Sequence, residues 1–119
     1  LLQHYWRNID PLDGQGQFCD RGDSYRPVIF TAGEQQATSA QSSAASAASE
    51  LGVSKSKIKV QIRDAVQFWP AEDYHQDYAN NNELRYRYYR FSCGRDRRLD
   101  AVWGERARSG ASWVAPLTP

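Results

Sequence analysis

The 119-residue sequence has no methionine, only two cysteines and almost no excess of either charge. No apolar run approaches the roughly 18 to 20 residues that a membrane-spanning helix needs, which argues against a transmembrane helix. Fifteen Lys and Arg stand against 14 Asp and Glu, and the resulting net charge of +1 selects neither nucleic acid nor a membrane as a partner.

The lack of methionine also means that the chain has no initiator residue, because it opens on Leu1 and Leu2. No signal-peptide pattern accounts for this opening. We therefore expect a fragment or a processed product that is truncated at its N-terminus. With no targeting signal, the default expectation for its compartment is the cytoplasm.

Cys19 and Cys93 are too few and too far apart in the sequence for a disulfide framework. Neither lies in a CxxC motif or near a pair of histidines, so a metal site is not indicated and no metal cofactor is expected. Two interpretations stay open: two reduced cytosolic thiols, or at least one thiol that exchanges electrons.

The sequence does contain 4 Trp, 7 Tyr and 4 Phe, enough large side chains for one folded domain. Apolar residues recur at intervals of three and four in the alanine-rich segment 37–49, which predicts a closely packed helix ending at Gly52. Strict alternation of Ile58, Val60 and Ile62 predicts a half-buried strand over 57–63, and Val66 and Phe68 keep the same parity.

The remaining elements complete an interleaved pattern. A helical end at 1–7, a loop over 12–26, a strand over Val28–Thr31, a helix over 70–79 and helical spacing over 99–103 are expected. This order predicts an α+β or α/β domain. We assign 1–108 to the domain and 109–119 to a flexible C-terminal tail.

Two segments carry candidate chemistry. The loop 12–26 holds three aspartates and Tyr25; these are solvated turn formers, weak calcium ligands, or a carboxylate and phenol that bind a polar oxygen. Segment 85–108 carries eight Arg against three acids, and cations alternate with aromatics over 85–91. That alternation favours a strand with one charged and one aromatic face, and the alternative is a surface for single-stranded nucleic acid over 85–98.

Four segments, in their order along the chain, resemble the C-terminal part of the peptide methionine sulfoxide reductase A family. The first runs from Tyr5 to Pro11 and ends in Ile-Asp-Pro, and the second is the loop Gly16 to Arg26. The third, Phe68 to Gln76, is close to the family's Phe-Tyr-x-Ala-Glu-Asp-x-His-Gln and is the most specific. The fourth, Tyr89 to Leu99, surrounds Cys93.

The resemblance implies an α/β fold, an α+β two-layer sandwich with a ferredoxin-like core, and a thiol mechanism. A nucleophilic cysteine attacks the sulfur of a methionine S-sulfoxide, free or in peptides, and a second cysteine condenses with the resulting sulfenic acid to a disulfide. Thioredoxin or another dithiol then reduces that disulfide, and no metal or organic cofactor takes part. The resemblance assigns Asp20 and Tyr25 to the sulfoxide oxygen and makes Cys93 the resolving cysteine.

The sequence departs from the family at several positions. The Gly-Cys-Phe-Trp motif of the nucleophile does not occur in these 119 residues, so we expect this chain alone to be inactive. Cys19 replaces the commoner Asn before Asp20. We interpret it as an inert buried thiol, with an alternative resolving thiol as the other possibility. The expected protein is a monomer that binds oxidised methionine peptides and thioredoxin, but neither nucleic acid nor membrane.

Overall fold

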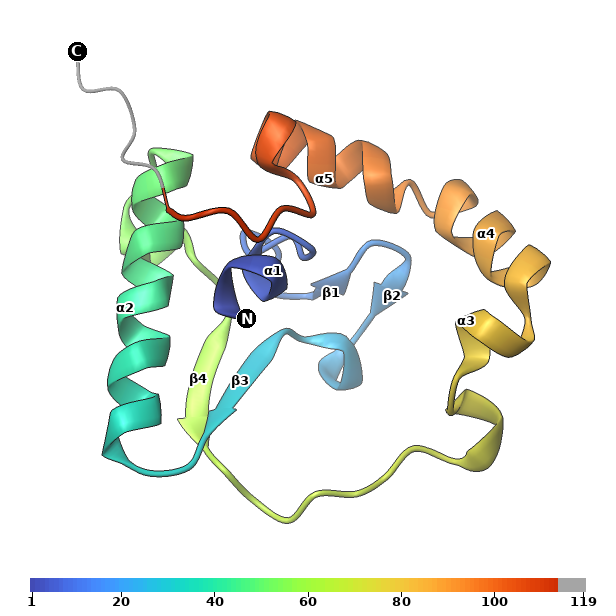
Figure 1. Ribbon diagram of the computed structural model, residues 1–119, viewed down its shortest axis with the longest axis horizontal. Helices are drawn as coiled ribbons and strands as arrows, with labels where there is room; N and C mark the ends of the chain where they lie inside the picture. The colour runs from blue at the N-terminus through green and yellow to red at the C-terminus, as the bar shows by residue number, and fades with distance from the viewer. Residues whose placement is uncertain (114–119) are drawn as a thin grey trace.

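A parallel pair of strands organises the fold in this computed structural model, which describes residues 1–113. Strand β3 (Val28–Thr31) pairs with β4 (Gln61–Asp64), and Ile29 lies opposite Ile62. Two parallel neighbours require a crossover connection, which α2 (Glu34–Leu51) supplies along one side of the molecule (Figure 1). The predicted strand over Val28–Thr31 and the α/β class are confirmed.

Helix α2 buries a face made of small residues, as the spacing predicts. Its buried positions are Ala40, Ser43, Ala44, Ala47 and Ala48. Small side chains let the helix axis come close to α1 (Leu2–Trp6), β3 and β4, all of which α2 contacts. Gly52 ends the helix in the left-handed region at φ 69°, a conformation that glycine adopts without a steric penalty.

The core forms where both ends of the chain meet α2 and the sheet. Trp6 from α1 and Leu99 and Trp103 from α5 (Arg95–Trp103) join Ala44, Ala47 and Val60 in one apolar cluster. The predicted helical spacing near Leu99 is therefore confirmed. The Trp6 Nε1–H donates to Ser43 Oγ at 2.9 Å, and that hydroxyl donates to the Ala40 carbonyl at 2.7 Å, so the indole N–H is satisfied inside the core.

A buried arginine ties the C-terminal segment to α1. Arg7 is fully buried and forms an ion pair with Glu50 at 2.7 Å. Its guanidinium also donates to the carbonyl oxygens of Ser109, Ala111 and Ser112. The flexible tail predicted over 109–119 thus begins with residues that pack on the domain, while 114–119 lie outside the described residues.

The segment after β4 differs from its prediction. A helix over 70–79 and a buried continuation of the strand at Val66 and Phe68 were expected. Instead the chain runs extended along the edge of the molecule, broken only by a 3-10 turn (Asp73–His75) and the one-turn α3 (Tyr78–Asn81) (Figure 1). Every residue from 63 to 81 is exposed, so no packed face is available to stabilise a longer helix.

The predicted strand over 85–91 is wrong, because these residues belong to helix α4 (Glu83–Ser92). Contacts four residues apart explain the helix: Arg87 pairs with Glu83, and Arg90 Nη1 donates to the Tyr86 hydroxyl at 3.2 Å. Such contacts stabilise a helix and have no counterpart in a strand. Alternation of Arg and Tyr over seven residues did not distinguish the two structures.

Candidate functional site

A short hairpin lies inside the segment predicted as a loop. Strands β1 (Gly16–Gln17) and β2 (Asp20–Arg21) pair antiparallel, which leaves Phe18 and Cys19 as the two turn residues. Phe18 has φ 55°, an uncommon value for a residue with a side chain. The Arg95 guanidinium packs 4.6 Å from the centroid of the Phe18 ring, so the turn is held against the start of α5.

The hairpin and α4 meet through two pairs of side chains. Tyr89 and Cys93 are four residues apart, and the Cys93 N–H donates to the Tyr89 carbonyl at 3.0 Å, so both lie on one side of the helix end. Asp20 and Cys19 are adjacent in the hairpin. Tyr89 contacts Asp20, and Cys93 contacts Cys19.

The cysteine contact is a disulfide. Cys19 and Cys93 are bonded, with their Cα atoms 5.2 Å apart. Both the interpretation of Cys19 as an inert buried thiol and that of two reduced thiols are therefore wrong for this structure; Cys19 is also exposed rather than buried. The sequence separation of 74 hid the pairing, because no local pattern records which distant segments the fold brings together.

A neutral phenol faces the Asp20 carboxylate. The Tyr89 hydroxyl donates a hydrogen bond to Asp20 Oδ2. Partial burial, together with this hydrogen bond and the negative charge of Asp20, raises the pKa of Tyr89 to about 12, and the neighbouring Tyr25 phenol acts in the same direction. Tyr89 therefore stays protonated at neutral pH and remains a donor.

The positive charge of Arg95 acts on this cluster. Its Nη2 donates to the Asn8 carbonyl at 2.7 Å, whereas its Nε is buried and has no hydrogen-bond partner among the described residues. Burial lowers the pKa of Arg95. The same cation opposes the rise in the pKa of Tyr89, which shows that it acts on the cluster electrostatically.

Beside the disulfide lies a cleft of about 900 Å³. Its charged lining consists of four cations and two carboxylates: Arg21, Arg26, Lys59, Arg98, Asp10 and Asp13. Arg26 also pairs with Asp23 at 3.1 Å, so the formal excess is one positive charge. Cys93 and Phe18 also line it. A ligand with negative charge or strong hydrogen-bond acceptors is the kind that this lining favours.

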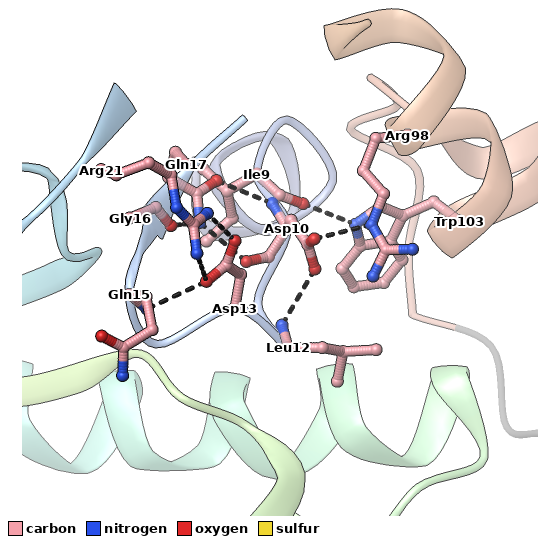
Figure 2. Close-up of polar contacts among 10 residues, drawn as sticks. All are labelled: Ile9, Asp10, Leu12, Asp13, Gln15, Gly16, Gln17, Arg21, Arg98 and Trp103. Atoms are coloured by element: carbon pink, nitrogen blue, oxygen red, sulfur yellow. Dashed lines mark hydrogen bonds and ion pairs between the residues drawn. The ribbon is translucent and has the colours of Figure 1, made fainter. Parts of the chain in front are cut away.

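Hydrogen bonds hold one wall of the cleft (Figure 2). Buried Asp10 accepts from Arg98 Nε at 2.7 Å and from the Leu12 N–H at 3.1 Å. Asp13 accepts from Arg21 and from the Gln15 N–H, and these contacts hold the pKa of its carboxyl below the usual value. Both carboxylates are thus engaged within the wall and orient its arginines.

Other classes of site have little support. Within residues 1–113 no cluster of His, Cys, Asp and Glu could hold a metal ion, and no helix is long and apolar enough to cross a bilayer. The arginine-rich segment 85–98 offers no observation in favour of nucleic acid. Arg87 and Arg90 are paired with Glu83 and Asp96, which removes part of the charge that phosphates would need.

Sequence reasoning located part of this site. It singled out Asp20, Tyr25 and Cys93, and the structure brings Asp20 and Cys93 to one hairpin–helix contact, with the half-exposed Tyr25 nearby. It missed Tyr89 and Arg95. In a helix, the spacing of four between Tyr89 and Cys93 puts both residues on one side and would have been a signal for Tyr89. Because 85–91 was predicted as a strand, this relation to Cys93 was not visible.

The sequence of the chain is similar to those of known proteins of one family. A family model described as peptide methionine sulfoxide reductase matches residues 1–107. The chain is 47% identical over 112 residues to peptide methionine sulfoxide reductase MsrA 2 of Rhizobium meliloti, covering 94% of this chain and 55% of that protein. It is 50% identical over 104 residues to MsrA 2 of Caulobacter vibrioides, covering 87% and 52%.

The chain spans about half the length of these relatives. Peptide methionine sulfoxide reductase MsrA of Bacillus licheniformis is 43% identical over 106 residues, which are 89% of this chain and 58% of that protein. No solved structure matches the chain.

Proposed function

Because the chain belongs to the peptide methionine sulfoxide reductase family, we propose that it forms the oxygen-binding and recycling part of an enzyme that reduces methionine S-sulfoxide. The observation that carries this proposal is the placement of Asp20 and Tyr89 directly beside the Cys19–Cys93 pair. A sulfoxide reductase needs both elements together: groups that hold a polar oxygen, and thiols that supply two electrons.

Asp20 and Tyr25 bind the sulfoxide oxygen in this proposal. A sulfoxide oxygen is a strong hydrogen-bond acceptor and becomes more basic as sulfur is attacked. The Tyr25 phenol stabilises it by donating a hydrogen bond, and Asp20 does so by giving it the proton of its acid form, which leaves Asp20 as a carboxylate. Tyr89 orients Asp20 by its hydrogen bond. The cationic cleft beside them binds the polar backbone of the substrate, which is free methionine sulfoxide or a peptide that contains it.

Cys93 acts as the resolving thiol. A reacting thiol, supplied outside these 119 residues, attacks the sulfoxide sulfur; methionine leaves and the thiol becomes a sulfenic acid. Cys93 then displaces water from that sulfur and forms a disulfide, and a dithiol such as thioredoxin supplies the two electrons that return the thiols. No metal or organic cofactor is required. We place this monomeric protein in the cytoplasm, where a reversible catalytic disulfide is the expected kind.

The test is a chimera in which this chain replaces the corresponding half of the Caulobacter vibrioides relative, which supplies the rest of the protein. With thioredoxin as reductant, the chimera should reduce the S epimer of N-acetyl-methionine sulfoxide over many turnovers. Asp20→Asn and Tyr25→Phe should each lower kcat/KM by roughly tenfold or more, since each removes a group that contacts the oxygen.

Asp100→Asn is the matched control, because the exposed Asp100 side chain pairs with Arg108, and neither residue lines the cleft. It should leave kcat/KM within about twofold. A folded chimera without turnover would contradict the proposed function. The isolated 119-residue chain should show no turnover, and thioredoxin-coupled sulfoxide reduction by it would contradict the assignment of Cys93 as a purely resolving thiol.

A further inference from the structure

The two sulfur atoms of the disulfide lie in different surroundings. Cys19 occupies the exposed turn of the hairpin, whereas Cys93 is half-buried between α4 and α5. An external thiolate must approach one sulfur along the line of the S–S bond, from the side opposite the other sulfur. Of the two residues, Cys19 is the more exposed and therefore offers more room for such an approach.

The charges around the two sulfurs also distinguish Cys19 from Cys93. Cys93 lines the cleft with its formal excess of positive charge, and cations stabilise a thiolate. Cys19 precedes the Asp20 carboxylate, and a neighbouring negative charge opposes a second one. When the disulfide opens, the negative charge is therefore better placed on Cys93 than on Cys19.

From this asymmetry we propose that Cys19 is the sulfur that the reductant attacks and Cys93 is the leaving thiolate. The reductant's thiolate bonds to Cys19 Sγ, the S–S bond breaks, and its electron pair passes to Cys93. The second thiol of the dithiol then displaces Cys19 as a thiolate, which takes a proton from solvent. Two electrons pass from the dithiol to the pair, and the dithiol becomes a disulfide.

This inference rests on the proposed function only for its place in the catalytic cycle. There the Cys19 thiolate displaces the reacting thiol from its disulfide with Cys93, and the reductant then opens the resulting Cys19–Cys93 bond and regenerates Cys93. It makes Cys19 a catalytic residue of recycling, separate from the groups that hold the sulfoxide oxygen. The exposed turn, and not the cleft, is then the place where the reductant makes contact. Cys93 is released as a thiolate beside the cleft, in the charge state required for the next condensation.

Directional trapping tests the assignment on the oxidised 119-residue chain. A brief pulse of reduced glutathione, stopped by acid and excess iodoacetamide, should yield chains with glutathione on Cys19 and a carbamidomethyl group on Cys93. Mass spectrometry of tryptic peptides separates the two adducts. Trypsin cleaves after Arg7 and Arg21, which places Cys19 on the peptide 8–21, and after Arg90 and Arg95, which places Cys93 on the peptide 91–95. We expect glutathione on Cys19 at least fivefold more often than on Cys93.

The matched control is the same pulse in strong denaturant. There the two cysteines are equally exposed and the cleft no longer exists, so the ratio of glutathione on Cys19 to glutathione on Cys93 should fall toward one to one. As a second measurement, thioredoxin that lacks its second cysteine should be trapped in a mixed disulfide with Cys19. An equal distribution on the folded chain, or a preference for Cys93, would overturn the inference. If the chimera fails to reduce sulfoxide while glutathione still selects Cys19, the proposed function fails and this inference stands.

Discussion

The phenol of Tyr89 donates its hydrogen bond to the carboxylate of Asp20, 69 positions earlier in the chain. The contact joins α4 to the hairpin at the same end of the helix as the Cys19–Cys93 disulfide. Two tertiary links, one covalent and one polar, therefore fix the hairpin that carries the candidate oxygen-binding carboxylate.

Replacing Tyr89 should alter the alkaline titration of the protein. The pKa of Tyr89 is raised to about 12, so Tyr89→Phe should remove one tyrosinate step near pH 12 from the absorbance at 295 nm, read after a rapid pH jump and before unfolding. Phe91→Leu, at an exposed position of the same helix, removes no ionisable group and should leave the amplitude of that step unchanged. An unchanged step in Tyr89→Phe would contradict the assigned environment.

The same shift has a consequence for stability. The folded protein holds the Tyr89 proton more tightly than the unfolded chain, in which tyrosine ionises near pH 10. The resulting stabilisation is complete below about pH 10 and is lost as the pH rises through about 12. Urea unfolding of the wild type should therefore weaken over this range more than that of Tyr89→Phe, and parallel curves would contradict the linkage.

The link between Trp6 and Ser43 tests the alanine-rich helix. Ser43→Ala should leave the Trp6 indole N–H without its partner inside the core, at a cost of about 1–3 kcal/mol in the free energy of unfolding. Ser42→Ala, one residue away on the exposed side of α2, is the control and should change stability by less than about 0.5 kcal/mol. Equal effects would mean that the indole contact contributes nothing specific.

Arg7 should protect the segment 106–112 from proteolysis. Arg7→Leu removes the buried partner of Glu50 and three hydrogen bonds to carbonyl oxygens of 109–112. We expect a loss of about 3 kcal/mol in stability and faster tryptic cleavage at Arg106 and Arg108. Arg85→Leu, at an exposed position, serves as control, and slow cleavage in Arg7→Leu would refute the anchoring role.

The periodicity of apolar residues correctly predicted the elements that pack an apolar face against the core. The spacing of alanines predicted α2 and its end at Gly52, and alternation placed Ile58, Val60 and Ile62 toward the core, where Val60 is buried and the two isoleucines are partly buried. β4 itself is shorter than the predicted strand, Gln61–Asp64 against 57–63. The segment 70–79 failed because its helical signals had no apolar surface to pack on.

The candidate site depended on contacts that no local pattern encodes. Asp20, Tyr25 and Cys93 came from the resemblance to a family, and their catalytic roles stay predictions. The Cys19–Cys93 bond joins segments 74 positions apart, and the misassigned strand over 85–91 concealed that Tyr89 and Cys93 share one side of a helix. A long-range pairing follows from the packing of α4 against the hairpin, which the sequence pattern does not specify.

Opening the disulfide should destabilise the chain measurably. A bond that closes a loop of this length restricts the unfolded ensemble by up to about 4 kcal/mol, so reduction should lower the free energy of unfolding by about 2–4 kcal/mol. Cys19→Ser and Cys93→Ser should each reproduce the reduced wild type, because either change opens the same link. The double variant should cost no more than either single one.

Dithiothreitol provides the control for this series. It should shift the urea midpoint of the oxidised wild type and leave both serine variants unchanged, since they have no bond to reduce. Circular dichroism should show α2 retained in every form, because its contacts with α1, β3 and β4 do not pass through the disulfide. If reduction leaves the wild-type midpoint unchanged, the hairpin is held by the Tyr89–Asp20 contact and the packing of Phe18 under Arg95, and the disulfide contributes to redox chemistry alone.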